Sequence, residues 1–234
     1  MIEIVADYLS VFPRGVARGL AKPLSLFIAE PERQDFIKKV KEKTSEAYIL
    51  ASKGVKFDYY EKKEDSGLSS DEYCNHAPSA SFVDKALKAL NPNPNHSFID
   101  IGSGAGYAMY KASSKFKKVY GIEIDPRWNQ IAEDNFRKLG LKNCTVFTSD
   151  INDIALEQID DINVFYMYNP FQGQTMDLFS DKIEQSFIRH PRDVYIVYVN
   201  AVCQDCFDRR KSFIRYKKIA HKNWDTLIYK CKEA

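Results

Sequence analysis

Short apolar runs alternate with one-sided helical patterns along the chain from residue 79 onward. Five of the runs have the length of a buried strand: residues 98–101, 119–122, 145–148, 162–168 and 194–199. Between them, apolar residues recur at three- and four-residue spacing, which is typical of helices that pack on a sheet, in residues 82–90, 128–139 and 178–187. Two last β-prone segments, 213–220 and 224–229, predict an antiparallel hairpin. The alternation predicts an α/β fold with a mostly parallel sheet.

Local signals mark where two of these helices begin and end. Asp125 before Pro126 is typical of a helix start, and Gly140 is typical of a helix end. Thr175 is the expected cap of the helix that carries residues 178–187.

The first 78 residues lack this alternation. Prolines and glycines interrupt the apolar positions of residues 1–30, which predicts short helices, whereas residues 31–51 carry a charged helical pattern with one apolar stripe. Residues 54–80 predict an aromatic loop, a candidate lid beside a binding site. We therefore expect an N-terminal helical arm with a lid-like loop at 1–78 and one α/β domain at 79–234.

The first predicted strand of this domain runs into a glycine-rich turn. Its sequence from Asp100 is D-I-G-S-G-A-G, in which the glycines are Gly102, Gly104 and Gly106. The second predicted strand ends on Glu123. Glycines let a backbone approach a ligand closely, and an acid about 20 residues further on can bind a ribose diol. The order therefore predicts a site for a nucleotide-type cofactor.

The spacing of the glycines argues against a dinucleotide. A dinucleotide fingerprint reads G-x-G-x-x-G, whereas these glycines stand at every second position and Asp100 lies two residues before the first. A carboxylate beside the turn would repel a pyrophosphate, but it suits a cofactor with a cationic sulfonium and an ammonium group.

At these residues the chain resembles the class I S-adenosylmethionine-dependent methyltransferases, whose first motif is a D/E-x-G-x-G-x-G loop and whose second strand ends in an acid. The resemblance implies a Rossmann-like three-layer sandwich whose mostly parallel seven-stranded sheet ends in an antiparallel hairpin. It implies S-adenosyl-L-methionine as the cofactor, with Asp100 supporting its methionine part and Glu123 on its ribose hydroxyls. The residues implied to cradle the methionine part are Gly102, Ser103, Gly104 and Gly106.

The third predicted strand delivers a second acidic residue to the expected cofactor. In the class, an acid at this place accepts a hydrogen bond from the adenine amino group, and its apolar neighbour contacts the ring. The resemblance implies these roles for Asp150 and Ile151, with Ile124 on the other face of the ring. The alternative is that Asp150 only caps the helical turn that follows it.

The fourth predicted strand ends in Asn169-Pro170-Phe171. These residues resemble the N/D-P-P-Y/F motif of methyltransferases that act on exocyclic or amide nitrogens. In that motif the asparagine oxygen and the proline carbonyl accept hydrogen bonds from a planar NH2 group, on which the aromatic ring stacks. Here the second proline is absent, so the aromatic residue stands one place earlier. We predict Asn169, Pro170 and Phe171 as catalytic residues, with a nitrogen nucleophile as the candidate acceptor; a strand-ending turn is the alternative.

Upstream of the glycine loop, a looser pattern points to one branch of the same class. Phe57-Asp58, Ser66-Gly67 and Tyr73 follow the order F-D, S-G, Y that precedes the glycine loop in a bacterial branch. Packing of the aromatic residues is the alternative explanation.

Composition and charge change this picture little. The 234 residues are 44% hydrophobic and 28% charged, as in ordinary globular proteins, and the net charge is +2. We therefore expect a small molecule or a protein as the acceptor rather than nucleic acid, although the basic segment after Phe207 either meets an acidic partner or forms a solvated edge hairpin. The chain has no apolar run of membrane-spanning length, and we expect no secretory signal, because its first residues carry Glu3 and Asp7 and no basic cluster. A cytoplasmic protein without a membrane partner is expected.

The cysteines leave one motif to explain. Cys203 and Cys206 have zinc or redox spacing, but they form the only such pair among five cysteines, so reduced thiols and no metal are expected. Two other functions stay open at this point: a protein that binds S-adenosylmethionine without transferring its methyl group, and an NAD-dependent oxidoreductase. The sequence does not predict an oligomeric state.

Overall fold

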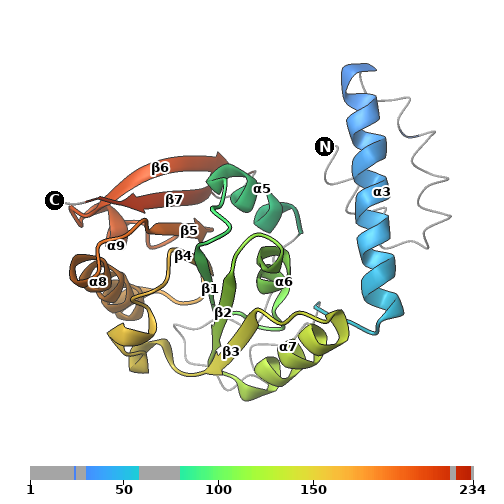
Figure 1. Cartoon of the computed structure of the whole chain (residues 1–234). Coiled ribbons are helices and arrows are strands. Elements are labelled where there is room, and N and C mark those ends of the chain that lie inside the picture. Colours follow the sequence, from blue (N-terminus) through green and yellow to red (C-terminus); the bar gives the residue numbers. More distant parts are fainter. Residues whose placement is uncertain (1–23, 25–29, 58–79, 222–224, 233–234) are drawn as a thin grey trace. The chain divides into compact units, whose positions relative to one another are not determined.

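The structure is a computed structural model that describes residues 24, 30–57, 80–221 and 225–232 (Figure 1). The chain divides into two compact units, Met1–Lys56 and Phe57–Ala234. The short helices expected in residues 1–29 and most of the lid-like loop lie outside the described residues, as do Asp58, Ser66, Gly67 and Tyr73.

The described residues of the first unit form a long helix. Helix α3, Glu30–Ser52, covers the charged segment that the sequence predicted to be helical. Phe36 and Val40 are fully buried, and the side chain of Ile37 is half-buried. These residues belong to the predicted apolar stripe, because positions four residues apart share one face of a helix.

The second unit is built on a seven-stranded sheet with the order β3-β2-β1-β4-β5-β7-β6. Strands β1 to β5 pair in parallel, and β7 runs antiparallel to both β5 and β6. This confirms the predicted mostly parallel sheet with an antiparallel hairpin. The strands are β1 (Ser97–Ile101), β2 (Lys118–Glu123), β3 (Cys144–Thr148), β4 (Val164–Tyr168), β5 (Tyr195–Val199), β6 (Phe213–Ala220) and β7 (Asp225–Cys231).

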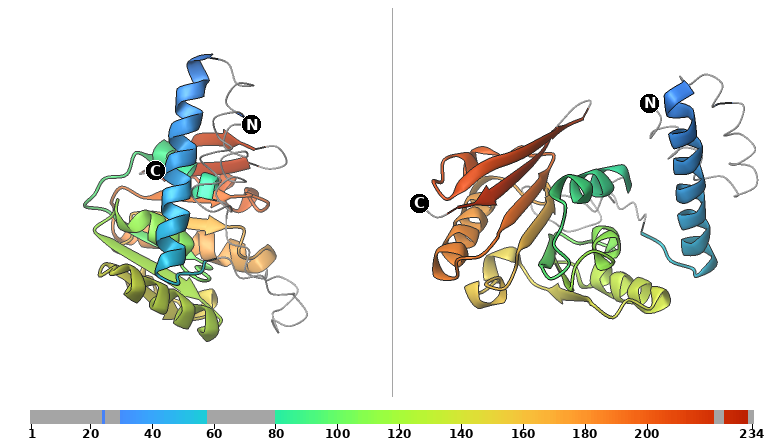
Figure 2. Two further views of the ribbon diagram at one scale, coloured as in Figure 1. Left: turned by 90° about the vertical axis from the view of Figure 1, so that its right-hand side faces the viewer. Right: turned by 45° about the horizontal axis from the view of Figure 1, so that its top comes forward.

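Helices cover both faces of the sheet, as Figures 1 and 2 show. One buried cluster joins β1, β2 and β4 to α5, α6 and α7, and a second joins the opposite face to α8 and α9. The result is the predicted three-layer sandwich. The helices are α5 (Ala80–Leu90), α6 (Tyr107–Ser113), α7 (Pro126–Leu139), α8 (Gly173–Arg189) and α9 (Asp205–Asp208), with short 3-10 turns η1 (Ile151–Asp153) and η2 (Leu156–Gln158).

Two helix starts show how far local signals reach. The Asp125 side chain accepts a hydrogen bond from the backbone N–H of Arg127, with Pro126 at the first position of α7, as predicted. The predicted cap of α8 at Thr175 is wrong, because α8 begins at Gly173 and Gln172 is its N-cap residue. Gly173 has a φ of +61°, a turn that glycine adopts without strain and that lets the helix start two residues earlier.

The strand order reverses beside β1. Strand β1 lies between β2 and β4. After β1 the chain adds β2 and β3 on one side of it, and then adds β4 and β5 on the other side. In open α/β sheets, ligands bind at the carboxyl ends of the strands where this reversal occurs. The ends of β1, β2, β3 and β4 are therefore the place to look for a site.

Helix α7 packs directly against the glycine loop at Gly106. A Cβ atom built on Gly106 would lie 2.5 Å from Cζ of Phe136 and 3.2 Å from Cβ of Ala132. Asn135 of the same helix donates its side-chain N–H to the carbonyl oxygen of Ala105 at 3.2 Å. The missing side chain at Gly106 thus allows the close contact that fixes the loop on α7.

Replacing Gly106 by alanine should therefore destabilise the fold more than the same change at Gly140. Both glycines have a positive φ, +86° and +71°, but a Cβ at Gly140 would meet no atom within 4 Å. Gly140→Ala should lower the free energy of unfolding by about 1 kcal/mol. Gly106→Ala should lower it by about 3 kcal/mol, because overpacking adds to the backbone strain. Urea denaturation measures both, and equal losses would contradict the proposed contact.

Candidate functional site

The glycine loop folds over the end of β2. The backbone N–H groups of Gly102 and Ser103 both donate to the carbonyl oxygen of Ile122, at 2.9 and 3.0 Å, and the N–H of Gly106 donates to Ser103. All three glycines of the loop have positive φ angles. These bonds hold the loop between the ends of β1 and β2, where its backbone faces the rim of the sheet.

Glu123 binds the glycine loop and the start of α7 with one carboxylate. Its Oε2 accepts the N–H of Gly104 at 2.9 Å, and its Oε1 accepts the N–H of Asp125 at 3.1 Å. Burial raises the pKa of Glu123 above its ordinary value, and the two backbone hydrogen bonds lower it in part. The acid that the sequence singled out is thus also a structural clamp.

Asp100 is a second buried carboxyl group at this end of the sheet. Its side chain is 4% exposed, and no ion pair joins it to any of the described residues. Burial raises the pKa of Asp100 well above the ordinary value, and the negative charge of Glu123 raises it further. Two acids that share a buried place favour either a proton or a bound cation between them.

Two hydroxyl groups below the loop make no hydrogen bond within the described part of the chain. They are Oγ of Ser103 and the hydroxyl of Tyr166, both buried. Tyr166 is the register partner of Asp100 on β4, and a Cβ on Gly121 would come within 2.7 Å of the Ser103 Oγ. Buried hydroxyls nearly always have a partner, so this polar place fits a ligand with hydrogen-bonding groups.

The residues after β2 and β3 line the next part of the rim. Ile124 follows Glu123 and is 39% exposed, whereas Ile151 is buried in the core cluster that includes α8. Asp150 accepts the backbone N–H of Asn152 at 2.8 Å through Oδ1, so it caps η1. The capping role that was the alternative for Asp150 is therefore present, through one of its two oxygens.

The residues after β4 divide between the rim and the core. Asn169 is 8% exposed with a φ of +41°, and a Cβ on Gly102 would lie 3.0 Å from Cβ of Pro170. Asn169-Pro170 thus adjoins the glycine loop. The ring of Phe171 instead packs edge-on against Phe179 of α8, with the ring centroids 5.8 Å apart. The structure brings the first two residues to the site and buries the third in the core.

Strand β5 adds two polar residues that the sequence analysis did not single out. The hydroxyl of Tyr198 lies 3.4 Å from Oδ1 of Asn169. Asn200, with a φ of +52°, follows Val199, which is the register partner of Tyr168. Asn169 and Asn200 therefore end neighbouring strands at the same level. A tyrosine inside an apolar strand was the available signal, but only the strand pairing shows which residue it meets.

The Cys203-x-x-Cys206 segment forms a turn beyond β5. The N–H of Cys206 donates to the carbonyl oxygen of Cys203 at 3.1 Å, and both thiols are free. Among the described residues, no group of three or more His, Cys, Asp or Glu side chains is arranged to hold a metal ion. None of the described helices is both long and apolar enough to cross a membrane.

Comparison with known proteins shows the family of this chain. The family model described as a methyltransferase domain matches residues 92–226, which is more than half of the 234 residues. The chain belongs to this methyltransferase-domain family. The predicted class I methyltransferase and its cofactor, S-adenosyl-L-methionine, are thereby confirmed.

Individual relatives share shorter stretches with the methyltransferase domain. An uncharacterized RNA methyltransferase, YwfF, of Lactococcus lactis is 40% identical over 60 residues, 26% of this chain and 12% of the relative. A probable cobalt-precorrin-6B C(15)-methyltransferase (decarboxylating) of Methanococcus maripaludis is 32% identical over 72 residues, 31% of this chain and 40% of the relative. The chain therefore spans less than half the length of either relative.

A solved structure shares the fold over a longer range. Precorrin-6y C5,15-methyltransferase from Geobacter metallireducens matches with a TM-score of 0.52 at 13% identity, over 73% of this chain and 95% of that chain. At this identity the likeness shows the fold alone.

The polar groups of the rim fit S-adenosylmethionine. Its sulfonium and ammonium groups are cations of the kind that the buried Asp100 carboxylate lacks among the described residues. The hydroxyls of Ser103 and Tyr166 have hydrogen-bonding capacity to spare. The three glycines of the loop have positive φ angles and no side chains, so a ligand can approach the loop backbone closely.

Asp100→Asn should stabilise the protein in the absence of ligand, and the gain should grow with pH. An acid whose pKa is raised on folding destabilises the folded state as pH rises from its unfolded pKa of about 3.9 toward its folded pKa. The raised pKa of Asp100 therefore predicts no difference between variant and wild type near pH 4 and a widening difference above it. Melting temperatures across this pH range measure the effect, and a constant offset would contradict the burial of a titrating carboxyl.

Proposed function

We propose that this protein transfers the methyl group of S-adenosylmethionine to a nitrogen nucleophile that is held beside Asn169-Pro170. The observation that carries the proposal is the contact between Gly102 and Pro170, where an added Cβ would leave only 3.0 Å. The glycine loop belongs to the cofactor side and Pro170 to the predicted acceptor side. Because so little space separates them, a nucleophile at Asn169 would be close to a group bound at the loop.

The cofactor side uses residues from three strand ends. Asp100 neutralises the cationic groups, and the loop formed by Gly102, Ser103, Gly104 and Gly106 cradles the methionine part. Glu123 binds the ribose hydroxyls while it keeps its two backbone hydrogen bonds. Ile124 and Ile151 contact the adenine ring, and the second oxygen of Asp150, which does not cap η1, accepts the adenine amino group. The exposure of Ile124 at the rim supports its part in this assignment.

The acceptor side needs alignment more than acid or base chemistry. S-adenosylmethionine supplies an activated methyl group when bound, and an in-line displacement requires the nucleophile to be held on its axis. The Asn169 side-chain oxygen and the Pro170 carbonyl can accept N–H groups of a planar nitrogen. Neither takes up a proton at neutral pH, so both orient the nucleophile. As the N–C bond forms, the S–C bond breaks and S-adenosylhomocysteine leaves, and the proton on the methylated nitrogen is released to water. We assign Phe171 to support of this loop from the core, because its ring packs on Phe179.

The class of acceptor stays open between small molecule, protein and nucleic acid. The relatives include one named as an RNA methyltransferase and one named as a cobalt-precorrin methyltransferase, so the sequence-based preference against nucleic acid has no support from them. Most of the described cations of the basic C-terminal segment form ion pairs within the fold. The pairs are Arg209–Asp177, Arg210–Asp177, Arg215–Asp208, Lys218–Asp225 and Lys230–Asp193.

Calorimetric titration with S-adenosylmethionine and S-adenosylhomocysteine tests the cofactor half of the proposal, with NADH as a control. Micromolar binding of both sulfur compounds and none of NADH is expected. Tritiated S-adenosylmethionine is then offered with total RNA, with a protein extract and with a small-molecule extract in separate reactions. Label in one pool supports methyl transfer and names the acceptor class. Tight cofactor binding with label in none would favour a protein that binds the cofactor without transferring its methyl group.

Glu123→Ala should weaken S-adenosylmethionine binding by about 2 kcal/mol, because a charge-assisted bidentate contact is lost. Glu133→Ala, an exposed acid on α7, is the matched control and should bind as wild type does. Calorimetry gives both affinities. Unchanged affinity in the first variant would remove Glu123 from the ribose site and leave it only as the clamp of the glycine loop.

Asn169→Ala should lower turnover about 100-fold with cofactor affinity unchanged, because a mispositioned nucleophile loses alignment. The labelled pool from the tritium experiment serves as substrate. Asn95→Ala is the control, since Asn95 is exposed and precedes the opposite end of β1. Full turnover in Asn169→Ala would show that the acceptor binds elsewhere.

A further inference from the structure

The side chain of Asn169 is held by one polar contact from the neighbouring strand. Tyr198 of β5 donates its hydroxyl hydrogen to Oδ1 of Asn169 at 3.4 Å, and both side chains are buried. An asparagine amide can turn by half a rotation about its last bond, which exchanges its oxygen and nitrogen. At 3.4 Å the contact is longer than a typical O–H···O hydrogen bond, and it favours the orientation that presents the oxygen to the phenol.

The direction of the Tyr198 hydroxyl is itself set by the backbone. The N–H of Cys203 donates to the Tyr198 hydroxyl oxygen at 3.2 Å. Cys203 is fixed in turn because its carbonyl oxygen accepts the N–H of Cys206 at 3.1 Å. A phenol has one hydrogen to donate. With a backbone N–H on its oxygen, that hydrogen is directed to the other side of the phenol, where Oδ1 of Asn169 and the Cys203 thiol are its partners.

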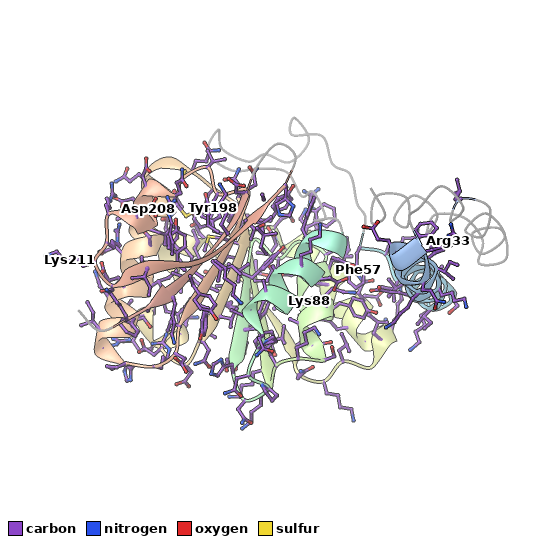
Figure 3. All side chains as sticks on the ribbon, turned by 90° about the horizontal axis from the view of Figure 1, so that it is seen from above. Arg33, Phe57, Lys88, Tyr198, Asp208 and Lys211 are labelled. Carbon is purple, nitrogen blue, oxygen red and sulfur yellow. The ribbon has the colours of Figure 1, made fainter. Side chains whose placement is uncertain are left out.

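The Tyr198 ring cannot move away from this position. Tyr198, labelled in Figure 3, is fully buried in the core. Its ring packs against Phe207 of α9 with the ring centroids 5.8 Å apart. Burial raises the pKa of Tyr198 well above its ordinary value. The phenol therefore keeps its hydrogen over the whole physiological pH range and acts as a neutral donor.

We propose that Tyr198 is a positioning residue, whose hydroxyl fixes the orientation of the Asn169 amide toward the methyl acceptor. This inference rests on the proposed function, because it takes Asn169 as the group that meets the acceptor. The Cys203-x-x-Cys206 turn then has a role without a metal or a disulfide: its backbone N–H aims the phenol. Because the Asn169 amide then holds one orientation instead of two, less conformational entropy is lost when the acceptor is aligned on it.

A second buried tyrosine provides a matched control. Tyr229 of β7 is also fully buried and also packs on Phe207, with the ring centroids 5.3 Å apart. Its hydroxyl donates to Asp208 at 3.0 Å rather than to the site. Tyr198→Phe and Tyr229→Phe each remove one buried, hydrogen-bonded hydroxyl and keep the ring. Tyr229→Phe should destabilise the fold at least as much, because its hydroxyl donates to a carboxylate.

Side-chain amide resonances of 15N-labelled protein test the link without any acceptor. Loss of one resonance pair in Asn169→Ala assigns Asn169. In Tyr198→Phe this pair should shift and exchange faster with solvent, whereas in Tyr229→Phe it should stay as in wild type. An unshifted Asn169 pair in Tyr198→Phe overturns the proposal. If Tyr198→Phe does not fold, 3-fluorotyrosine is incorporated into wild-type protein and into Asn169→Ala instead. One fluorine signal should then differ between these two proteins, and it must not be the signal of Tyr229.

Turnover on the labelled pool tests what the link does. Tyr198→Phe should lower kcat about tenfold with KM for S-adenosylmethionine unchanged, which is the effect of one lost neutral hydrogen bond. Tyr229→Phe should keep both values. Equal kcat in Tyr198→Phe and wild type overturns the positioning role even if the resonance shifts. Label in no pool instead contradicts the proposed function, and the amide resonances still report separately on the Tyr198–Asn169 contact.

Discussion

The two hydrogen bonds of the Glu123 carboxylate support the rest of the cofactor side. Through Gly104 and Asp125, one side chain fixes the glycine loop and the first turn of α7, while α7 returns to the loop at Gly106 and Ala105. Loop and helix therefore depend on the same carboxylate. Glu123, which the proposed function places on the ribose, is therefore also part of the scaffold. Measuring affinity and stability together separates these two roles.

The neighbouring carboxyl group of Asp100 shows why such a site is costly to maintain. The sheet buries an acid next to another acid, and the described residues supply no cation for it. Each such group lowers stability in the absence of ligand and strengthens binding of a positively charged one. The hydroxyls of Ser103 and Tyr166 also lack hydrogen-bond partners within the described part of the fold, so they are available to bind a ligand.

The sequence predicted the sheet and its order of elements well, because apolar runs and caps such as Asp125-Pro126 are local signals. It placed the start of α8 at Thr175 because capping preferences ignore a glycine that turns with a positive φ. It missed α9, which has only four residues. Phe171 and Tyr198 were beyond its reach for another reason. The Phe171 ring packs on Phe179 of α8, and the Tyr198 hydroxyl meets the residue after β4. Both contacts join elements that are apart in the sequence, and no local pattern encodes them.

The contact between Gly102 and Pro170 also bears on how such a domain can change over evolutionary time. The two residues stand on different motifs, yet the space that one leaves is filled by the other. A larger residue at either place would displace the partner, so their substitutions would be strongly non-additive. Under the proposed function, a change on the acceptor side at Pro170 would thus act on the segment that holds the cofactor.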